Sequence, residues 1–138
     1  MHPAAGALNR PMGGYRETLR RMTIRDDGLA ADAASSGTRG LAASGLDAKT
    51  HALVRIATLA AVDAAPQCYG PWVDAAHQGG ASDEEIVGAL IAAIPSVGYP
   101  RIVSAAPKLA LALGYDLEDA LEDDRTESDG DADLPAAR

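Results

Sequence analysis

The residues best able to do chemistry cluster around one turn in the middle of the chain. Cys68 is the only cysteine, Trp72 is the only tryptophan, and His77 follows shortly after them. We expect Cys68 at the start of a helix, where the helix N-terminus lowers the pKa of a thiol and favours the nucleophilic thiolate. A histidine beside it would be a general base. Cys68 and His77 are therefore the catalytic candidates.

The spacing of the two residues weakens this pairing. His77 follows Cys68 by nine residues, which places the two side chains roughly 180° apart on a straight helix. His77 would serve Cys68 only if the turn is irregular or if a neighbouring subunit supplies it. A structural or surface histidine fits the spacing better. Cys68 itself could be a small buried hydrophobe.

Aromatic and polar side chains near the turn could bind a ligand. Tyr69 and Trp72 would suit a flat apolar molecule, or they could pack in the core or a subunit interface. His51 and Arg55 could form a polar face toward the site, or a solvated face. Arg101 follows a proline at an expected helix start, where the dipole does not favour a cation, so it could bind a ligand carboxylate or a partner subunit.

Two carboxylates, Asp63 and Asp74, flank the turn and could do acid–base work. Neither spacing matches a metal-binding motif. We therefore predict no metal and no cofactor.

Helical periodicity and capping residues divide the chain into short helices. The clearest signal is a Ser-x-x-Glu capping box at Ser82 and Glu85. Asp47 is a good N-cap, and prolines and glycines supply the expected ends. The expected segments are 15–22, 28–34, a possible turn at 39–43, 47–64, 68–79, 83–95 (ending at a proline), 100–113 (bent or split at Pro107) and 117–121.

No run of residues alternates as a β-strand does, so the predicted class is an all-α helical bundle. We expect a flexible arm over 1–14, short helices and a loop over 15–45, the main helical domain over 46–122, and a disordered acidic tail over 123–138. Hydrophobic residues make up 47% of the chain but aromatics only 4%. An alanine-rich helical layer of this size often completes its burial against a partner subunit.

Charge and apolar patterning exclude several classes. The net charge of −8 argues against a nucleic-acid partner, which requires clustered cations. No apolar run is long enough to span a membrane, and the N-terminus does not read as an export signal. A lone cysteine fits a reducing compartment. We expect a cytoplasmic protein.

Three stretches carry a resemblance to a known family: 46–50 (LDAKT) opening a buried helix, 79–86 (GGASDEEI), and 94–101 (IPSVGYPR). With the turn at Cys68, they resemble the carboxymuconolactone decarboxylase family, which includes the alkylhydroperoxidase D-like proteins, from about Gly45 to Leu121. The resemblance implies an all-α bundle that assembles into trimers or hexamers. It also implies either decarboxylation of a muconolactone or thiol-dependent peroxide reduction.

The peroxidase branch of that family uses Cys-x-x-Cys-x-x-x-His with a Glu on the preceding helix. We align this pattern to the chain by the spacing from the family His to the Gly before the capping box. The two Cys positions then fall on Ala65 and Cys68, the His position on Trp72, and the Glu position near Ala52. Of these four positions, only Cys68 holds the residue type that the family pattern requires. A disulfide cycle within one chain is impossible with one cysteine.

Three functional hypotheses follow. The first is an enzyme of this family that acts on a small organic substrate without the two-Cys mechanism. The second is a homo-oligomer that binds a ligand or serves as a scaffold and has lost the chemistry. The third is a one-Cys peroxidase in which an external thiol resolves Cys68.

Overall fold

Helices are the only regular secondary structure in the residues that the computed structural model describes, 14–35 and 38–130. The predicted all-α class is confirmed. The elements, in chain order, are α1 (Gly14–Thr23), α2 (Asp27–Ala34), α3 (Thr38–Ser44), α4 (Ala48–Ala61), the 3-10 turn η2 (Pro66–Cys68), α5 (Tyr69–Gln78), α6 (Asp83–Val97), α7 (Tyr99–Ala112) and α8 (Leu117–Gly130).

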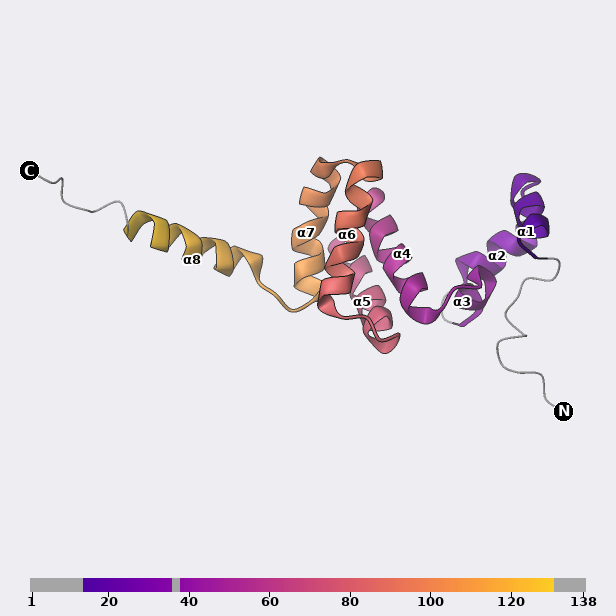
Figure 1. The fold of residues 1–138 in the computed structure, drawn as a ribbon, viewed down its shortest axis with the longest axis horizontal. Helices are drawn as coiled ribbons and strands as arrows, with labels where there is room; N and C mark the ends of the chain where they lie inside the picture. The colour runs from indigo at the N-terminus through magenta and orange to yellow at the C-terminus, as the bar shows by residue number, and fades with distance from the viewer. Residues whose placement is uncertain (1–13, 36–37, 131–138) are drawn as a thin grey trace, which may run out of the picture.

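Helices α4 to α7 form the central bundle (Figure 1). Its core contains Ile56 of α4, Val73 of α5, Ile86 of α6 and Leu109 of α7, each at most 2% exposed. Alanines fill much of the remaining core, at positions 52, 60, 76 and 105. Small side chains let the helix backbones approach closely, so the bundle packs without large aromatic residues apart from Tyr69.

Local sequence signals start these helices as predicted. The Asp47 carboxylate accepts a hydrogen bond from the N–H of Thr50 at 2.7 Å and caps α4. The Ser82 hydroxyl accepts from the N–H of Glu85 at 3.1 Å, and the Glu85 carboxylate accepts from the N–H of Ser82 at 2.9 Å. Lys49 Nζ lies 3.0 Å from Glu85 Oε1 and links the start of α4 to the start of α6.

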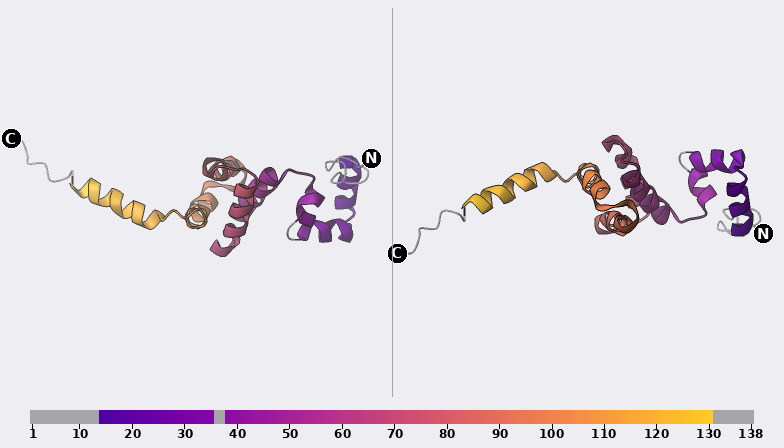
Figure 2. Two further views of the ribbon diagram at one scale, coloured as in Figure 1. Left: turned by 90° about the horizontal axis from the view of Figure 1, so that it is seen from below. Right: turned by 90° about the horizontal axis from the view of Figure 1, so that it is seen from above.

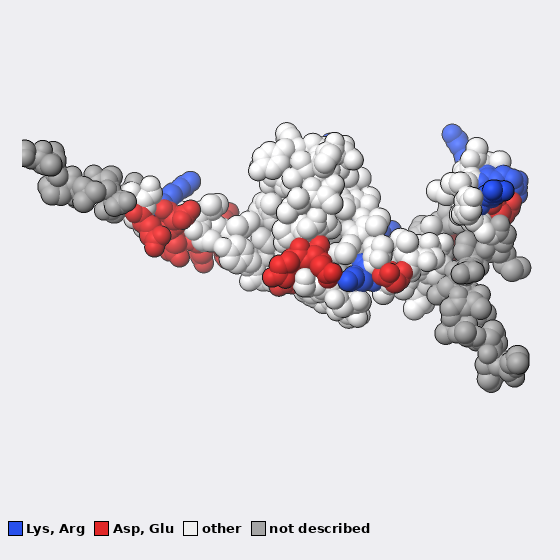
Figure 3. Space-filling model, viewed as in Figure 1, with Lys and Arg blue, Asp and Glu red and all other residues white. Residues whose placement is uncertain are grey.

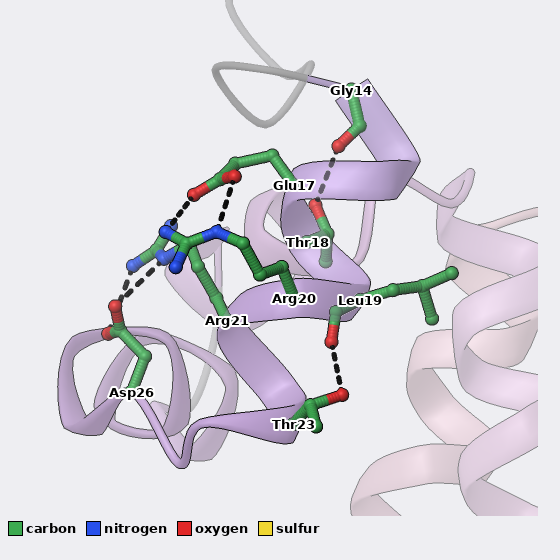
Figure 4. Close-up of polar contacts among 8 residues, drawn as sticks. All are labelled: Gly14, Glu17, Thr18, Leu19, Arg20, Arg21, Thr23 and Asp26. Atoms are coloured by element: carbon green, nitrogen blue, oxygen red, sulfur yellow. Dashed lines mark hydrogen bonds and ion pairs between the residues drawn. The ribbon is translucent and has the colours of Figure 1, made fainter.

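Helices α1 to α3 form a separate group on one side of the bundle (Figures 1 and 2). The Asp26 carboxylate caps α2 by accepting from the N–H of Leu29 at 3.0 Å. It also accepts two hydrogen bonds from the Arg21 guanidinium, at 3.0 and 3.1 Å (Figure 4). The bonds from Arg21 and Leu29 lower the pKa of Asp26 to about 2. One carboxylate thus joins α1 to α2.

Helix α8 extends from the opposite side of the bundle (Figures 1 and 2). It continues to Gly130, so the prediction of disorder from residue 123 was wrong for 123–130. High polarity predicts disorder here, but the Asp116 carboxylate caps the first turn of α8. Leu117, Glu118, Ala120 and Leu121 are good helix formers, and the helix continues from them into the polar segment. The expected arm and the end of the expected tail, residues 1–13 and 131–138, lie outside the described residues.

Two predicted helix ends were also wrong, and one predicted interruption has a different outcome. Helix α6 passes Pro95 and ends at Val97, because a proline in the last turn removes a single hydrogen bond. Helix α4 ends at Ala61 rather than near residue 64, and Asp63 adopts a left-handed conformation with φ 53°. Pro107 lies inside α7, which remains one helix from Tyr99 to Ala112 and is not split.

Among the described residues, no helix combines the length and the apolar character that crossing a membrane requires.

Candidate functional site

Cys68 lies where the sequence predicted it, at the end of η2 and the N-cap of α5. Its thiol is exposed and makes no capping hydrogen bond with the described residues. The alternative that Cys68 is a buried hydrophobe therefore does not hold in the single chain. The thiol is accessible to a small oxidant or thiol reagent.

His77 does not join Cys68. It is exposed in the last turn of α5, and its Nε2 lies 2.7 Å from Asp83 Oδ1 at the start of α6. This contact bridges the α5–α6 turn. The structure thus places the two catalytic candidates at different ends of α5.

Tyr69 is a core residue in this fold. Its side chain is fully buried, and its hydroxyl has no hydrogen-bond partner among the described residues. Burial, and then the nearby Asp63 and Cys68, raise the pKa of Tyr69. The ring does not line the cavity described next, so Tyr69 supports the site by packing.

Trp72 and His51 do lie together, in the wall of a cavity of about 550 Å³ between α3, α4 and α5. Their ring centroids are 5.5 Å apart with an interplanar angle of 63°, an edge-to-face arrangement. The residues that line the cavity are Thr38, Leu41, Ala48, His51, Pro71, Trp72, Ala75, Gln78 and Gly79. Most of this wall is apolar.

Arg55 completes the polar side of this arrangement. Its guanidinium carbon lies 4.5 Å from the centroid of the Trp72 ring, in cation–π contact, one helical turn after His51. Burial, and then the charge of Arg55, lower the pKa of His51. His51 is therefore neutral at pH 7, and its ring nitrogens can donate or accept a hydrogen bond.

Helix α3 contributes to the cavity, which the sequence did not indicate. Thr38 and Leu41 line it from outside the predicted main domain. The only signal was a possible helical turn at 39–43. Nothing in the local pattern could show that this turn lies against α4 and α5.

Arg101 lies elsewhere, exposed in the first turn of α7. Near the start of η2, Asp63 Oδ1 accepts hydrogen bonds from Lys108 Nζ at 3.0 Å and Ser104 Oγ at 2.9 Å. These two bonds, and to a smaller extent Arg101, lower the pKa of Asp63. Asp63 therefore joins the turn to α7. Sequence reasoning missed Lys108, because this contact depends on tertiary packing.

Within the described residues, no group of three or more His, Cys, Asp or Glu side chains could hold a metal ion. His51 is the one ionisable side chain among the cavity-lining residues. The geometry provides a flat aromatic wall with a few hydrogen-bonding groups.

The fold and these sequence features are those of one protein family. The profile of the carboxymuconolactone decarboxylase family matches residues 29–111, so the chain belongs to this family. The match begins in α2, earlier than the predicted start near Gly45, and ends before the predicted Leu121. Searches of curated proteins and of solved structures found no match.

The structure also places the four positions that the resemblance associates with peroxidase chemistry. Ala52 is fully buried in the core, and Ala65 is exposed before η2. Cys68 and Trp72 lie one helical turn apart at the start of α5. Neither an alanine nor a tryptophan side chain can act as a general acid or base.

Proposed function

We propose that this protein is a homo-oligomeric member of the carboxymuconolactone decarboxylase family that binds a small, flat and mainly apolar organic molecule. The observation that carries the proposal is the cavity of about 550 Å³ walled by the Trp72 and His51 rings. This volume lies within the roughly 300–1,000 Å³ typical of small-molecule sites.

The lining supports such a ligand chemically. A planar molecule would stack on or meet the edge of the Trp72 ring, while Leu41, Pro71 and Ala75 cover its apolar surface. Neutral His51, with Thr38 and Gln78 at the wall, offers the few polar contacts that fix orientation.

Binding fits the residues better than the family's known chemistry does. No carboxylate is among the residues that line the cavity, and Cys68 is outside it. The expected Glu and His positions hold Ala52 and Trp72. The cavity therefore retains a means of binding without an evident proton donor for decarboxylation.

The single tryptophan makes the proposal directly testable. We expect 1-anilinonaphthalene-8-sulfonate, a flat aromatic probe, to bind the full-length chain and to accept energy from Trp72. The variant Ala75→Leu fills part of the cavity and should weaken probe binding about ten-fold or more, since steric overlap removes the binding volume.

The matched control is Ala92→Leu, because Ala92 is exposed on α6 and does not line the cavity. It should bind the probe as the wild type does. Equal affinities of the wild type, Ala75→Leu and Ala92→Leu would show that the probe binds elsewhere, and the cavity proposal would then be abandoned.

One observation favours a second candidate, a one-Cys peroxidase: the Cys68 thiol is exposed at a helix N-terminus. The thiolate would attack the O–O bond of a hydroperoxide, forming a sulfenic acid and releasing the alcohol. An external thiol would then form a mixed disulfide with loss of water, and a second thiol would regenerate Cys68. Thiol-dependent consumption of cumene hydroperoxide that Cys68→Ser abolishes would support this candidate, and equal rates in the two proteins would exclude it.

A further inference from the structure

Helix α1 presents an apolar stripe that no other residue of the described segments, 14–35 and 38–130, buries. Tyr15, Leu19 and Met22 are 70%, 57% and 61% exposed, and α1 has no buried residue. Their spacing places them on one face of the helix. In Figure 4 the Leu19 side chain points away from the ion pairs of Arg20 and Arg21. Such a face indicates a partner.

Helix α8 carries a charge pattern that disfavours an isolated helix. It extends away from the bundle (Figure 1), and residues 118–127 contain six carboxylates and one arginine. Glu118 and Glu122, and likewise Asp123 and Glu127, are like charges four residues apart, which destabilise an isolated helix. A single helix of this length is marginal in water. Positive charge brought against α8 would stabilise it.

The two helices carry complementary patterns with the same spacing. In α1, Tyr15 and Leu19 are each followed by an arginine, Arg16 and Arg20. In α8, Leu117 and Leu121 are each followed by a glutamate, Glu118 and Glu122. At about 100° per residue, the charged pair borders the apolar stripe on the same side in both helices.

We propose that α1 of one copy packs antiparallel against α8 of a second copy. Two facing helices with charges on the same side of the stripe bring those charges together only when they run antiparallel. Arg16 and Arg20, the latter 60% exposed although paired with Glu17, then lie beside Glu118 and Glu122. Within one chain, α1 and α8 lie on opposite sides of the bundle (Figure 2), so the contact requires a second copy.

The antiparallel direction also provides a place for Met22. The end of α1 then lies beside the start of α8, next to a groove of about 450 Å³ lined in part by Val87, Leu113, Tyr115 and Leu117. Val87 and Tyr115 are 42% and 56% exposed. Met22 would enter this groove. The residues of this contact do not line the ligand cavity.

Charge reversal with full-length chains tests the pairing. Arg16→Glu/Arg20→Glu and Glu118→Lys/Glu122→Lys should each weaken the α1–α8 association, measured by sedimentation equilibrium at low salt, by roughly ten-fold or more. An equimolar mixture of the two variants should regain it, because both contacts of the mixed pair unite opposite charges. Circular dichroism checks that each variant folds.

The matched control is Asp123→Lys/Glu127→Lys, which changes the same charge on the other side of the α8 stripe. It should leave the association within about two-fold of the wild type, since these positions do not face Arg16 and Arg20. A large loss in this control, with none in Glu118→Lys/Glu122→Lys, would overturn the antiparallel arrangement.

If copies also associate through the bundle, chemical cross-linking still tests the α1–α8 contact. In a Cys68→Ser background, Leu19→Cys chains mixed with Leu117→Cys chains should be joined by a short bismaleimide. Leu19→Cys chains mixed with Ser96→Cys chains should not. An oligomer without the Leu19–Leu117 cross-link would overturn this contact while leaving association through the bundle intact.

Loss of binding to phosphatidylserine vesicles in Arg16→Glu/Arg20→Glu, without any change in self-association, would instead identify an anionic membrane as the partner.

Discussion

Gly79 shows how a single residue sets the shape of the candidate site. It follows α5 and lies against the first turn of α4. A Cβ atom at this position would lie 2.7 Å from the Lys49 nitrogen and 2.9 Å from the Lys49 Cα. Both atoms belong to the backbone, so neither can rotate away. Because Gly79 also lines the cavity, the close approach of the two helices and the site depend on the same missing side chain.

We expect Gly79→Ala to lower the free energy of unfolding by about 1–3 kcal/mol, since the added methyl group forces α4 and α5 apart. Gly88→Ala is the control, because Gly88 lies inside α6 with open space around its Cβ position. It should raise stability by about 0.5–1 kcal/mol through helix propensity. Urea unfolding measures both variants, and equal effects of the two alanines would contradict the close contact at Gly79.

The lowered pKa of His51 predicts that the stability of the fold depends on pH. Burial, and then Arg55, lower its pKa below the usual 6.5 in the folded chain, so the unfolded chain binds the proton first. The contribution of neutral His51 is therefore complete above about pH 6.5 and decreases as the pH falls from that value toward the lowered pKa. Urea unfolding between pH 8 and 5 should show this decrease in the wild type and less of it in His51→Gln.

His77→Gln is the control for this measurement, because His77 is exposed and lies outside the cavity. If His51→Gln retains the full pH dependence of the wild type, another group is responsible and the assignment to His51 fails.

At the scale of the elements, the N-terminal helices depend on polar contacts instead of burial. Neither α1 nor α2 contains a buried residue. The Asp26 carboxylate holds them together by accepting from Arg21 and from the N–H of Leu29 (Figure 4). The order of both helices should therefore follow the ionisation of one carboxylate.

The pKa of Asp26 is lowered from 3.8 to about 2 in the folded chain. Its stabilising effect is thus complete above about pH 3.8 and is lost as the pH falls through about 2. Asp26→Asn should remove amide-exchange protection in α1 and α2 at pH 7 and leave α4 to α7 unchanged. Asp27→Asn, which keeps the bonds to Arg21, should retain that protection, and a similar loss in both variants would contradict the role of Asp26.

At the scale of the whole molecule, the bundle exposes several large apolar side chains. Val54, Ile91, Val103 and Leu111 are 50%, 62%, 55% and 67% exposed. Figure 3 shows the visible face over α6 and α7 almost without charged residues, while acidic residues gather at the start of α6 and along α8. Large apolar side chains that are exposed in a single chain are often buried in a subunit interface. This is the structural support for the proposed homo-oligomer.

We expect Ile91→Lys to weaken association of the bundles by roughly ten-fold or more, since a charge buried in an apolar interface loses its hydration. Ser96→Lys, an exposed polar position on the same helix, is the control and should associate as the wild type does. Light scattering after size-exclusion chromatography gives the mass. A monomeric wild type would refute the oligomer, and the Leu19–Leu117 cross-link would distinguish the two interfaces.

Much of the fold was predictable because its signals are local. Asp26, Asp47 and the Ser82–Glu85 box start helices through hydrogen bonds that span three residues, and the sequence displays them directly. The ends of the helices were less predictable, because whether a helix tolerates a proline such as Pro95 depends on the position of the proline in the last turn. The sequence indicated a helical turn at 117–121 but not its continuation to Gly130.

The sequence by itself determined the all-α class and the family, and it separated Cys68 from His77 along the chain. The assignment of the family's acid–base positions to Ala52 and Trp72 stays a prediction. Only the tertiary structure decided that Trp72 meets His51 and Arg55 across two helices, that α3 closes the cavity, and that Tyr69 lies in the core. The physical reason is the distance along the chain over which each kind of interaction acts. Caps and periodicity act within a few residues, whereas the cavity depends on how closely α4 and α5 approach, and Gly79 decides this through a contact with Lys49.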